Sequence, residues 1–374
     1  MRKTKKDEKP SEDNSKPCGS DPKDLPLKWH SPKAAPFHLA GLAWFATDGA
    51  YRRLPLKPAR PIPPNVDYLA NSTAGAQIRF QTNSTRLSLR VKLPSLADMN
   101  HMPATGQCGF DCYIGPPGAQ CYFRTTTYDQ RQVSYESMLL GPAPAEMRNF
   151  TVNFPLYKGV EEVSVGLDEG AEILPPPPYD SDLRVVAYGT SITQGGCACR
   201  PGMAYTNILS RRFNMEFINL GFSGNGRGEP EVAATIAEIE RPGCFILDYE
   251  ANSGSTDELK RTFPEFIRIL RDAHPKVPIL ALSRTNFSSD LFDPAGLQSR
   301  IERRDFQRSV IDGLRKKGDK FVYFKDGSEL LGKDFDECTV DGAHPTDLGF
   351  MRMADALTPV LRAILPAQSY KVPL

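Results

Sequence analysis

The sequence has almost no net charge, no long apolar run and few histidines. Its 374 residues carry a formal net charge of +1, so no strong electrostatic field attracts nucleic acid or an anionic membrane. No apolar run approaches the roughly 20 residues that a membrane-spanning helix needs. We therefore expect neither nucleic acid nor a membrane as a partner.

The first 25 residues also lack the apolar segment of a secretory signal. They are charged and rich in proline and serine, a composition typical of a disordered tail. We therefore predict a tail over residues 1–25 and a cytoplasmic protein. A secreted protein is the alternative if a signal precedes this sequence.

The eight cysteines do not form a recognisable metal motif. Cys108, Cys112 and Cys121 lie close together, but no second cluster completes the spacing of a zinc site. Cys197 and Cys199 are interpreted as two free thiols in a loop, with a redox or metal pair as the alternative. We expect no cofactor and no metal, and a reducing compartment.

The composition changes along the chain and predicts two domains. Residues 26–178 contain short segments in which apolar and polar residues alternate, separated by turn residues, and show no helical period. This pattern predicts an all-β, jelly-roll-like sandwich. The predicted strands are Gln77–Phe80, Arg86–Leu93, Cys121–Thr125, Phe150–Phe154 and Glu162–Leu167. A stiff run of four prolines at 175–178 marks the boundary.

Residues 179–374 alternate short apolar runs with helical stretches. The predicted strands are Arg184–Tyr188, Glu216–Leu220, Cys244–Tyr249, Val277–Leu282 and Phe321–Phe324. Helices are expected near 203–213, 229–240, 256–273, 299–317 and 346–363. Five β–α units in series predict a flavodoxin-like, three-layer α/β/α domain with five parallel strands. Ligands bind such sheets at the carboxyl ends of the strands.

Ser191 follows the first of these strands, in Gly189-Thr-Ser191. One interpretation makes it a nucleophile at the carboxyl edge of the sheet. The other makes it only the cap of the following helix. Gly-x-Ser is too weak a motif to decide between them.

The next two strand ends carry candidate oxyanion donors. Gly224 lies in a glycine-rich turn whose bare backbone N–H groups suit an anion. A phosphate cradle is disfavoured because no P-loop lysine follows. Asn252 can offer a side-chain N–H2 beside this turn, with a helix cap as the alternative role.

The last loop supplies a candidate base. His344 lies three residues after Asp341, ahead of the final helix, so it could take the Ser191 proton while Asp341 orients its ring. His274 sits at a helix end, where the helix dipole favours it. The other histidines fall in the predicted β-domain and are His30, His38 and His101.

Together these four blocks resemble the SGNH (GDSL-type) hydrolase superfamily. The resemblance covers about 180–365 and implies Ser191 as nucleophile, His344 as base and Asp341 as its partner. It implies an oxyanion hole made by the N–H groups of Ser191 and Gly224 with the Asn252 side chain. The chain departs from the family pattern in Gly-Thr-Ser for Gly-Asp-Ser, and in Glu250-Ala-Asn252-Ser for Gly-x-Asn-Asp.

A shorter match concerns the N-terminal region. Gly109-Phe-Asp-Cys-Tyr113 is similar to the Gly-x-Asp-Leu-Tyr pattern of the β-sandwich that precedes a subset of these esterases. Judged from its residues alone, the stretch Cys108–Gly115 is interpreted as a strand with a turn.

The resulting prediction is a serine esterase that removes small O-acyl groups, acetyl first, from a carbohydrate or related metabolite. Asn225, Arg227 and Arg284 follow strand ends and are candidate substrate contacts, with solvated surface arginines as the alternative. Two other functions are carried: an acyltransferase that uses the same triad, and a non-catalytic carbohydrate-binding protein.

Overall fold

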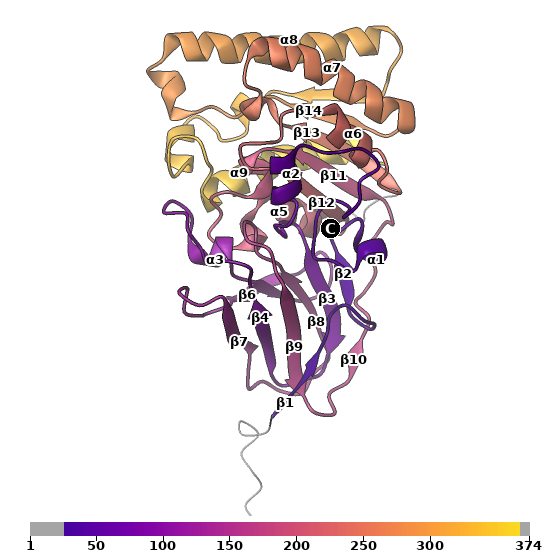
Figure 1. The fold of residues 1–374 in the computed structure, drawn as a ribbon, viewed down its shortest axis with the longest axis vertical. Helices are drawn as coiled ribbons and strands as arrows, with labels where there is room; N and C mark the ends of the chain where they lie inside the picture. The colour runs from indigo at the N-terminus through magenta and orange to yellow at the C-terminus, as the bar shows by residue number, and fades with distance from the viewer. Residues whose placement is uncertain (1–25, 367–374) are drawn as a thin grey trace, which may run out of the picture.

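The computed structural model describes residues 26–366, and within them a sandwich of antiparallel sheets lies against an α/β part (Figure 1). The predicted tail at residues 1–25 lies outside the described residues. No helix between residues 26 and 366 has the length and apolar character needed to cross a membrane.

The N-terminal part contains two antiparallel sheets. The first has the order β1-β9-β4-β7, and its strands are Leu27–His30 (β1), Leu87–Lys92 (β4), Ser134–Leu140 (β7) and Glu162–Asp168 (β9). The second has the order β10-β3-β8-β5-β6, with β2 also pairing β3. Its strands are His38–Ala40 (β2), Gln77–Thr82 (β3), Asp111–Ile114 (β5), Cys121–Thr125 (β6), Arg148–Asn153 (β8) and Ile173–Leu174 (β10).

Alternation along these strands fills the space between the two sheets. Leu89 and Val91 of β4 point into one buried cluster with Ile78 and Phe80 of β3, while Arg90 and Lys92 are exposed. This matches the rule that successive side chains of a strand point to opposite faces. The predicted sandwich is therefore confirmed.

The sequence predicted no helix in this part, but three short ones occur. They are Phe45–Asp48 (α1), Pro64–Leu69 (α2) and Ala104–Gln107 (α3). None exceeds 6 residues, which is under two helical turns, so no apolar period can develop.

The C-terminal part is built on one parallel sheet of five strands in the order β12-β11-β13-β14-β15. The strands are Arg184–Gly189 (β11), Glu216–Gly221 (β12), Pro242–Asp248 (β13), Ile279–Leu282 (β14) and Val322–Lys325 (β15). This is the flavodoxin-like order, as predicted. The α-helices are Ser191–Gln194 (α4), Tyr205–Phe213 (α5), Pro230–Ile236 (α6), Thr256–Ala273 (α7), Pro294–Lys316 (α8) and Asp347–Ile364 (α9). The 3-10 turns are Pro201–Met203 (η1), Glu250–Asn252 (η2), Ser288–Leu291 (η3), Gly327–Glu329 (η4) and Phe335–Cys338 (η5).

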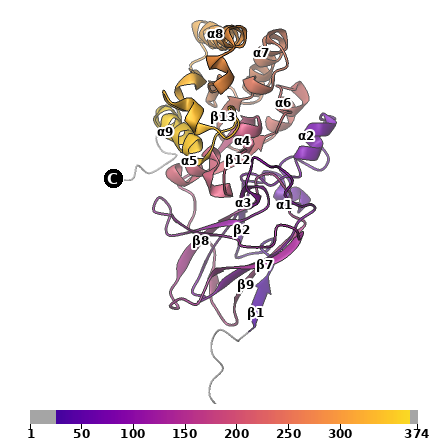
Figure 2. The same cartoon turned by 90° about the vertical axis from the view of Figure 1, so that its left-hand side faces the viewer.

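Helices cover both faces of this sheet because its strands are apolar on both sides. Val185 and Ala187 of β11 pack in a cluster with α5 and α9, while Val186 and Tyr188 pack with α6, α7 and α8. Figure 2 shows α5 and α9 on one side of the sheet and α6 and α7 on the other.

One N-terminal segment packs on the α/β part rather than on the sandwich. Leu54, Val66 and Ala70 are fully buried in the cluster that lies under α6 and α7. Figure 2 shows α2 beside α6, away from the two antiparallel sheets. The two parts therefore share a hydrophobic core.

Candidate active site

Ser191 is the first residue of α4, directly after β11. Thr190, not Ser191, caps this helix, because its hydroxyl accepts the N–H of Ile192 at 3.2 Å. The cap interpretation of Ser191 is therefore wrong. In the first helical turn the N–H of Ser191 has no acceptor inside the helix. Ser191 is 8% exposed and is therefore almost completely buried.

Ser191, His344 and Asp341 form a chain of two side-chain hydrogen bonds. The distance from Ser191 Oγ to His344 Nε2 is 2.8 Å, and from His344 Nδ1 to Asp341 Oδ2 it is 2.7 Å. The other carboxylate oxygen, Oδ1, accepts the backbone N–H groups of Ala343 and His344 at 3.1 and 2.8 Å. Asp341 therefore fixes both the loop and the ring. A proton on Nδ1 leaves the Nε2 lone pair for the Ser191 hydroxyl.

The Asp341 carboxylate is held in its charged form. Partial burial favours the neutral form, but hydrogen bonds from the backbone and ring of His344 and from Ala343 outweigh it. The net effect lowers the pKa of Asp341 below its ordinary value. An anion beside Nδ1 is what a histidine needs in order to accept a proton at Nε2.

The loop after β12 is tied to the Ser191 turn. Phe222 N–H donates to the Gly189 carbonyl at 2.9 Å, and Ser223 N–H donates to Gln194 Oε1 at 3.0 Å. A Cβ on Gly226 would lie 2.0 Å from the Gly189 carbonyl oxygen, so only glycine allows this approach. Gly224, two residues earlier in this loop, adopts the left-handed φ of 67°.

Asn252 ends the 3-10 turn η2 beside the same loop. Its Nδ2 donates to the Phe222 carbonyl at 3.3 Å, which leaves its second N–H free to face a ligand. The following helix, α7, is capped by Ser255, whose hydroxyl accepts the Glu258 N–H at 3.0 Å. The alternative role of Asn252 as cap of that helix is therefore wrong.

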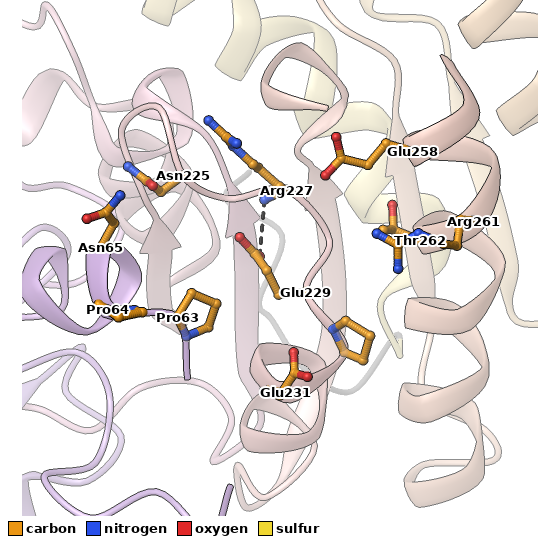
Figure 3. A pocket seen from close by; sticks show the side chains of 11 residues that line it. Pro63, Pro64, Asn65, Asn225, Arg227, Glu229, Glu231, Glu258, Arg261 and Thr262 are labelled. Carbon is orange, nitrogen blue, oxygen red and sulfur yellow. Dashed lines mark hydrogen bonds between the residues drawn. The ribbon is translucent and has the colours of Figure 1, made fainter. Parts of the chain in front are cut away.

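Two of the three candidate substrate residues line one pocket. Asn225 and Arg227 lie on the loop after β12, at the edge of a cavity of about 540 Å³. Figure 3 shows this loop between α2 on one side and α7 on the other. The N-terminal part therefore supplies one wall of the pocket, through Asn65 and the prolines before it.

Arg284 lies elsewhere. Its guanidinium is paired with the Asp290 carboxylate at 2.9 and 2.6 Å and donates to the Thr285 carbonyl at 2.9 Å. Its side chain is only 13% exposed, so it is neither a solvated surface arginine nor part of this pocket.

An ionic clasp that the sequence did not predict joins the sandwich to the Ser191 region. Asp111, on β5, is fully buried and accepts from Arg200 Nη1 and from the Gly202 N–H, both at 2.8 Å. Arg200 Nη1 also donates to the Tyr113 hydroxyl at 2.7 Å. The stretch Cys108–Gly115 is a strand, as interpreted, but its acid and aromatic hold the segment after α4. An acid among the apolar residues of a short strand is the one hint in the sequence, and it does not identify a partner that lies 89 residues away.

Arg53 is a second residue that sequence reasoning missed. It is 0% exposed and donates to the carbonyls of Asn219 and Gly221 at 3.2 and 2.5 Å, where β12 ends. It also donates to the carbonyls of Leu69 and Ser72 at 2.8 and 3.0 Å. Burial lowers the pKa of Arg53 to about 9, which still leaves it charged at neutral pH.

The cysteines and histidines of residues 26–366 are arranged as follows. All seven cysteines in this range are free thiols, as interpreted for Cys197 and Cys199. One group of potential metal ligands occurs in the same range and consists of His101, Cys197 and His344. His101 belongs to the predicted β-domain, yet its ring centroid lies 5.8 Å from that of His344.

Two family models match the chain. The GDSL-like lipase/acylhydrolase family matches residues 182–362. A second model, GxDLY, described as the N-terminus of SGNH-hydrolase-type esterases, matches residues 27–173. Both confirm the resemblance predicted from the sequence. No curated protein matches the chain.

Solved structures share this fold over most of the chain. A GDSL-like lipase from Bacteroides ovatus is 31% identical, with a TM-score of 0.83, over 90% of this chain and 98% of that one. A salicylyl-acyltransferase from a tetracycline biosynthetic pathway is 20% identical, with a TM-score of 0.74, over 90% and 97% of the two chains. A family two carbohydrate esterase from Clostridium thermocellum, in complex with cellohexaose, is 16% identical, with a TM-score of 0.53, over 78% and 92%.

Proposed function

This chain belongs to the GDSL-like lipase/acylhydrolase family, and from that membership we propose that it hydrolyses small O-acyl esters of carbohydrates with Ser191 as nucleophile. It is a hydrolase of the SGNH type. The observation that carries the proposal is the unbroken path Ser191 Oγ–His344 Nε2 at 2.8 Å and His344 Nδ1–Asp341 Oδ2 at 2.7 Å.

The chemistry is acyl transfer in two steps. Ser191 Oγ attacks the ester carbonyl as His344 Nε2 removes its proton, and the imidazolium is stabilised by the Asp341 carboxylate. His344 then gives the proton to the leaving alcohol. Water repeats the sequence to release the acyl group. The N–H groups of Ser191 and Gly224 and the Asn252 amide are the proposed donors to the oxyanion.

The cavity lined by Asn225, the residue after Gly224, is the proposed site for the alcohol portion. It is lined by Asn225, Arg227, Glu258 and Arg261, among others, and such polar side chains suit a ligand rich in hydroxyl groups. The carbohydrate esterases from Clostridium thermocellum and from Cellvibrio japonicus share the fold, with TM-scores of 0.53 and 0.57. Both considerations support an acylated carbohydrate over a lipid.

The nucleophile is tested with p-nitrophenyl acetate. We expect Ser191→Ala to abolish hydrolysis and His344→Ala to lose about as much, because triad members act as a unit. Ser289→Ala, an exposed serine on η3, is the matched control and should keep wild-type activity. Equal rates for Ser191→Ala and wild type would refute the proposal and leave the non-catalytic carbohydrate-binding function.

The substrate class needs two further measurements. With p-nitrophenyl esters of increasing acyl length, we expect kcat/KM to fall after acetyl, and acetylated oligosaccharides to release acetate. A preference for long acyl chains would contradict the proposed small acyl group. Asn225→Ala and Arg227→Ala should raise KM for the sugar ester more than for p-nitrophenyl acetate.

An acyltransferase is the second candidate. The similarity of the fold to a salicylyl-acyltransferase, at a TM-score of 0.74, supports this candidate. The acyl-enzyme is common to both reactions, and only the nucleophile of the second step differs. Product analysis with an added alcohol separates them, since a transferase forms the new ester in preference to the free acid.

A further inference from the structure

Three potential metal ligands from distant parts of the chain meet beside the proposed nucleophile. His101 comes from the segment between β4 and α3, Cys197 from the segment after α4, and His344 from the last loop. One ligand atom from each lies within 4.8 Å of the other two. Ser191 Oγ adjoins the group through its 2.8 Å contact with His344 Nε2.

The donor types favour zinc. Two imidazoles and a thiol are ligands of tetrahedral Zn²⁺, whose donor atoms sit about 3.5 Å apart. Starting from atoms within 4.8 Å of one another, closure onto the ion needs movements of roughly 1 Å. Cys197 is buried but the two histidines are partly exposed. A hollow of about 560 Å³ lined by His101 and Cys197 gives the ion a path to this point.

Both histidines already have the partner that a zinc-binding imidazole uses. Asp341 occupies Nδ1 of His344, so Nε2 is the nitrogen left to bind an ion. Asn100 Oδ1 lies 3.2 Å from Nδ1 of His101, which likewise leaves its Nε2 free. A ligand histidine typically donates its other ring N–H to a carboxylate or carbonyl oxygen in this way.

We propose that His101, Cys197 and His344 form a site for Zn²⁺ that reversibly switches off the proposed esterase. The ion binds Nε2 of His344 through the lone pair that would otherwise accept the Ser191 proton. A water molecule or Ser191 Oγ completes the tetrahedron. Since the base and the metal ligand are the same atom, zinc and catalysis exclude each other.

The Cys197 thiol must lose its proton in order to bind the ion. On zinc binding the S–H bond breaks, the proton passes to solvent, and an S–Zn bond forms.

Metal binding can be measured without any substrate. Co²⁺ added to chelator-treated protein should give the visible bands of a tetrahedral site and a thiolate-to-cobalt charge-transfer band. Cys197→Ser should lose the charge-transfer band, whereas Cys199→Ser, the neighbouring cysteine outside the cluster, should keep it. If wild type shows no charge-transfer band, or if Cys197→Ser keeps it, the site is refuted.

The inhibitory effect rests on the proposed function and is measured separately. Micromolar Zn²⁺ should inhibit p-nitrophenyl acetate hydrolysis by wild type and by Cys199→Ser, and chelator should restore it. His101→Ala and Cys197→Ser should keep their zinc-free activity and raise the inhibition constant at least about tenfold. Equal inhibition of all four proteins would overturn the proposal. An inactive wild type that still binds Co²⁺ would instead refute the esterase and leave the metal site.

Discussion

Replacing Asp341 with asparagine tests whether the carboxylate sets the protonation of His344. The side chain keeps its shape, and its oxygen can still accept the N–H groups of Ala343 and His344, which Asp341 Oδ1 accepts at 3.1 and 2.8 Å. The amide N–H2 then faces His344 Nδ1, where the carboxylate oxygen now lies at 2.7 Å.

The consequence is the wrong tautomer. An N–H2 group cannot accept the Nδ1 proton, so Nδ1 becomes the acceptor and the proton moves to Nε2, which faces Ser191 at 2.8 Å. Turning the amide over would restore Nδ1–H but would place N–H2 against two backbone N–H groups, at a cost of about 1–3 kcal/mol for each. With the amide unturned and the proton on Nε2, His344 can no longer take the Ser191 proton.

The expected loss in kcat is about 10³- to 10⁴-fold, or roughly 4–5.5 kcal/mol of barrier. Steady-state hydrolysis of p-nitrophenyl acetate measures it, with circular dichroism to show that the fold is kept. Asp336→Asn, an exposed carboxylate of the same loop, is the matched control and should be fully active. A rate for Asp341→Asn within about threefold of wild type would show that the Asp341 carboxylate does not set the tautomer of His344.

Three further predictions concern Asn252, Arg200 and Asp248. Asn252→Ala should lower kcat by about 10²- to 10³-fold with little change in KM, since an oxyanion donor acts on the transition state; a loss under twofold would remove Asn252 from the oxyanion hole. Arg200→Ala leaves the buried Asp111 unpaired and should lower the free energy of unfolding by about 3 kcal/mol in urea titration, and an unchanged midpoint would count against the clasp. Burial raises the pKa of Asp248 to about 7, against donors from Thr193 and Tyr205 and with help from Glu250, whereas the ordinary value is 3.8. The folded state therefore keeps a proton that the unfolded state releases, and wild-type stability falls as pH rises from about 4 to 7. The stability of Asp248→Asn relative to wild type should therefore rise across that window and stay constant above it. A pH-independent difference between the two proteins in urea titration would refute the assignment.

The sequence predicted the α/β part almost completely because its signals are local. Each strand of the parallel sheet is a short apolar run, and each helix has its own apolar period and its own start and stop residues. The type and order of these elements therefore follow from the pattern. Boundaries shifted, and the single helical turn Ser191–Gln194 (α4) was not predicted. The helix expected from 299 begins at Pro294, because Asp293 caps it and proline is well suited to the first helical position.

The strand β7 and the long-range contacts could not be predicted in the same way. Ser134–Leu140 (β7) alternates in burial but lies at a sheet edge and exposes Ser134, Glu136 and Met138, so its apolar signal is weak. The candidate triad could be named because residues of known chemistry fall at the ends of predicted strands. Arg53 and the Asp111–Arg200 pair gave no comparable signal, since their partners are 89–168 residues away and only the folded chain brings them together.

The buried Arg53 also constrains the order in which the molecule can be completed during synthesis. Its donors leave the ribosome 166 residues before the Asn219 carbonyl and 168 before that of Gly221. Domains generally fold as units from the N-terminus, so an already folded sandwich would carry an uncovered guanidinium until β12 arrived. That cation would stay hydrated until the strand docked, and docking would desolvate it and fix the end of β12 just before Gly224. The first part of the chain would therefore act as a template for the loop on which the proposed oxyanion donor lies.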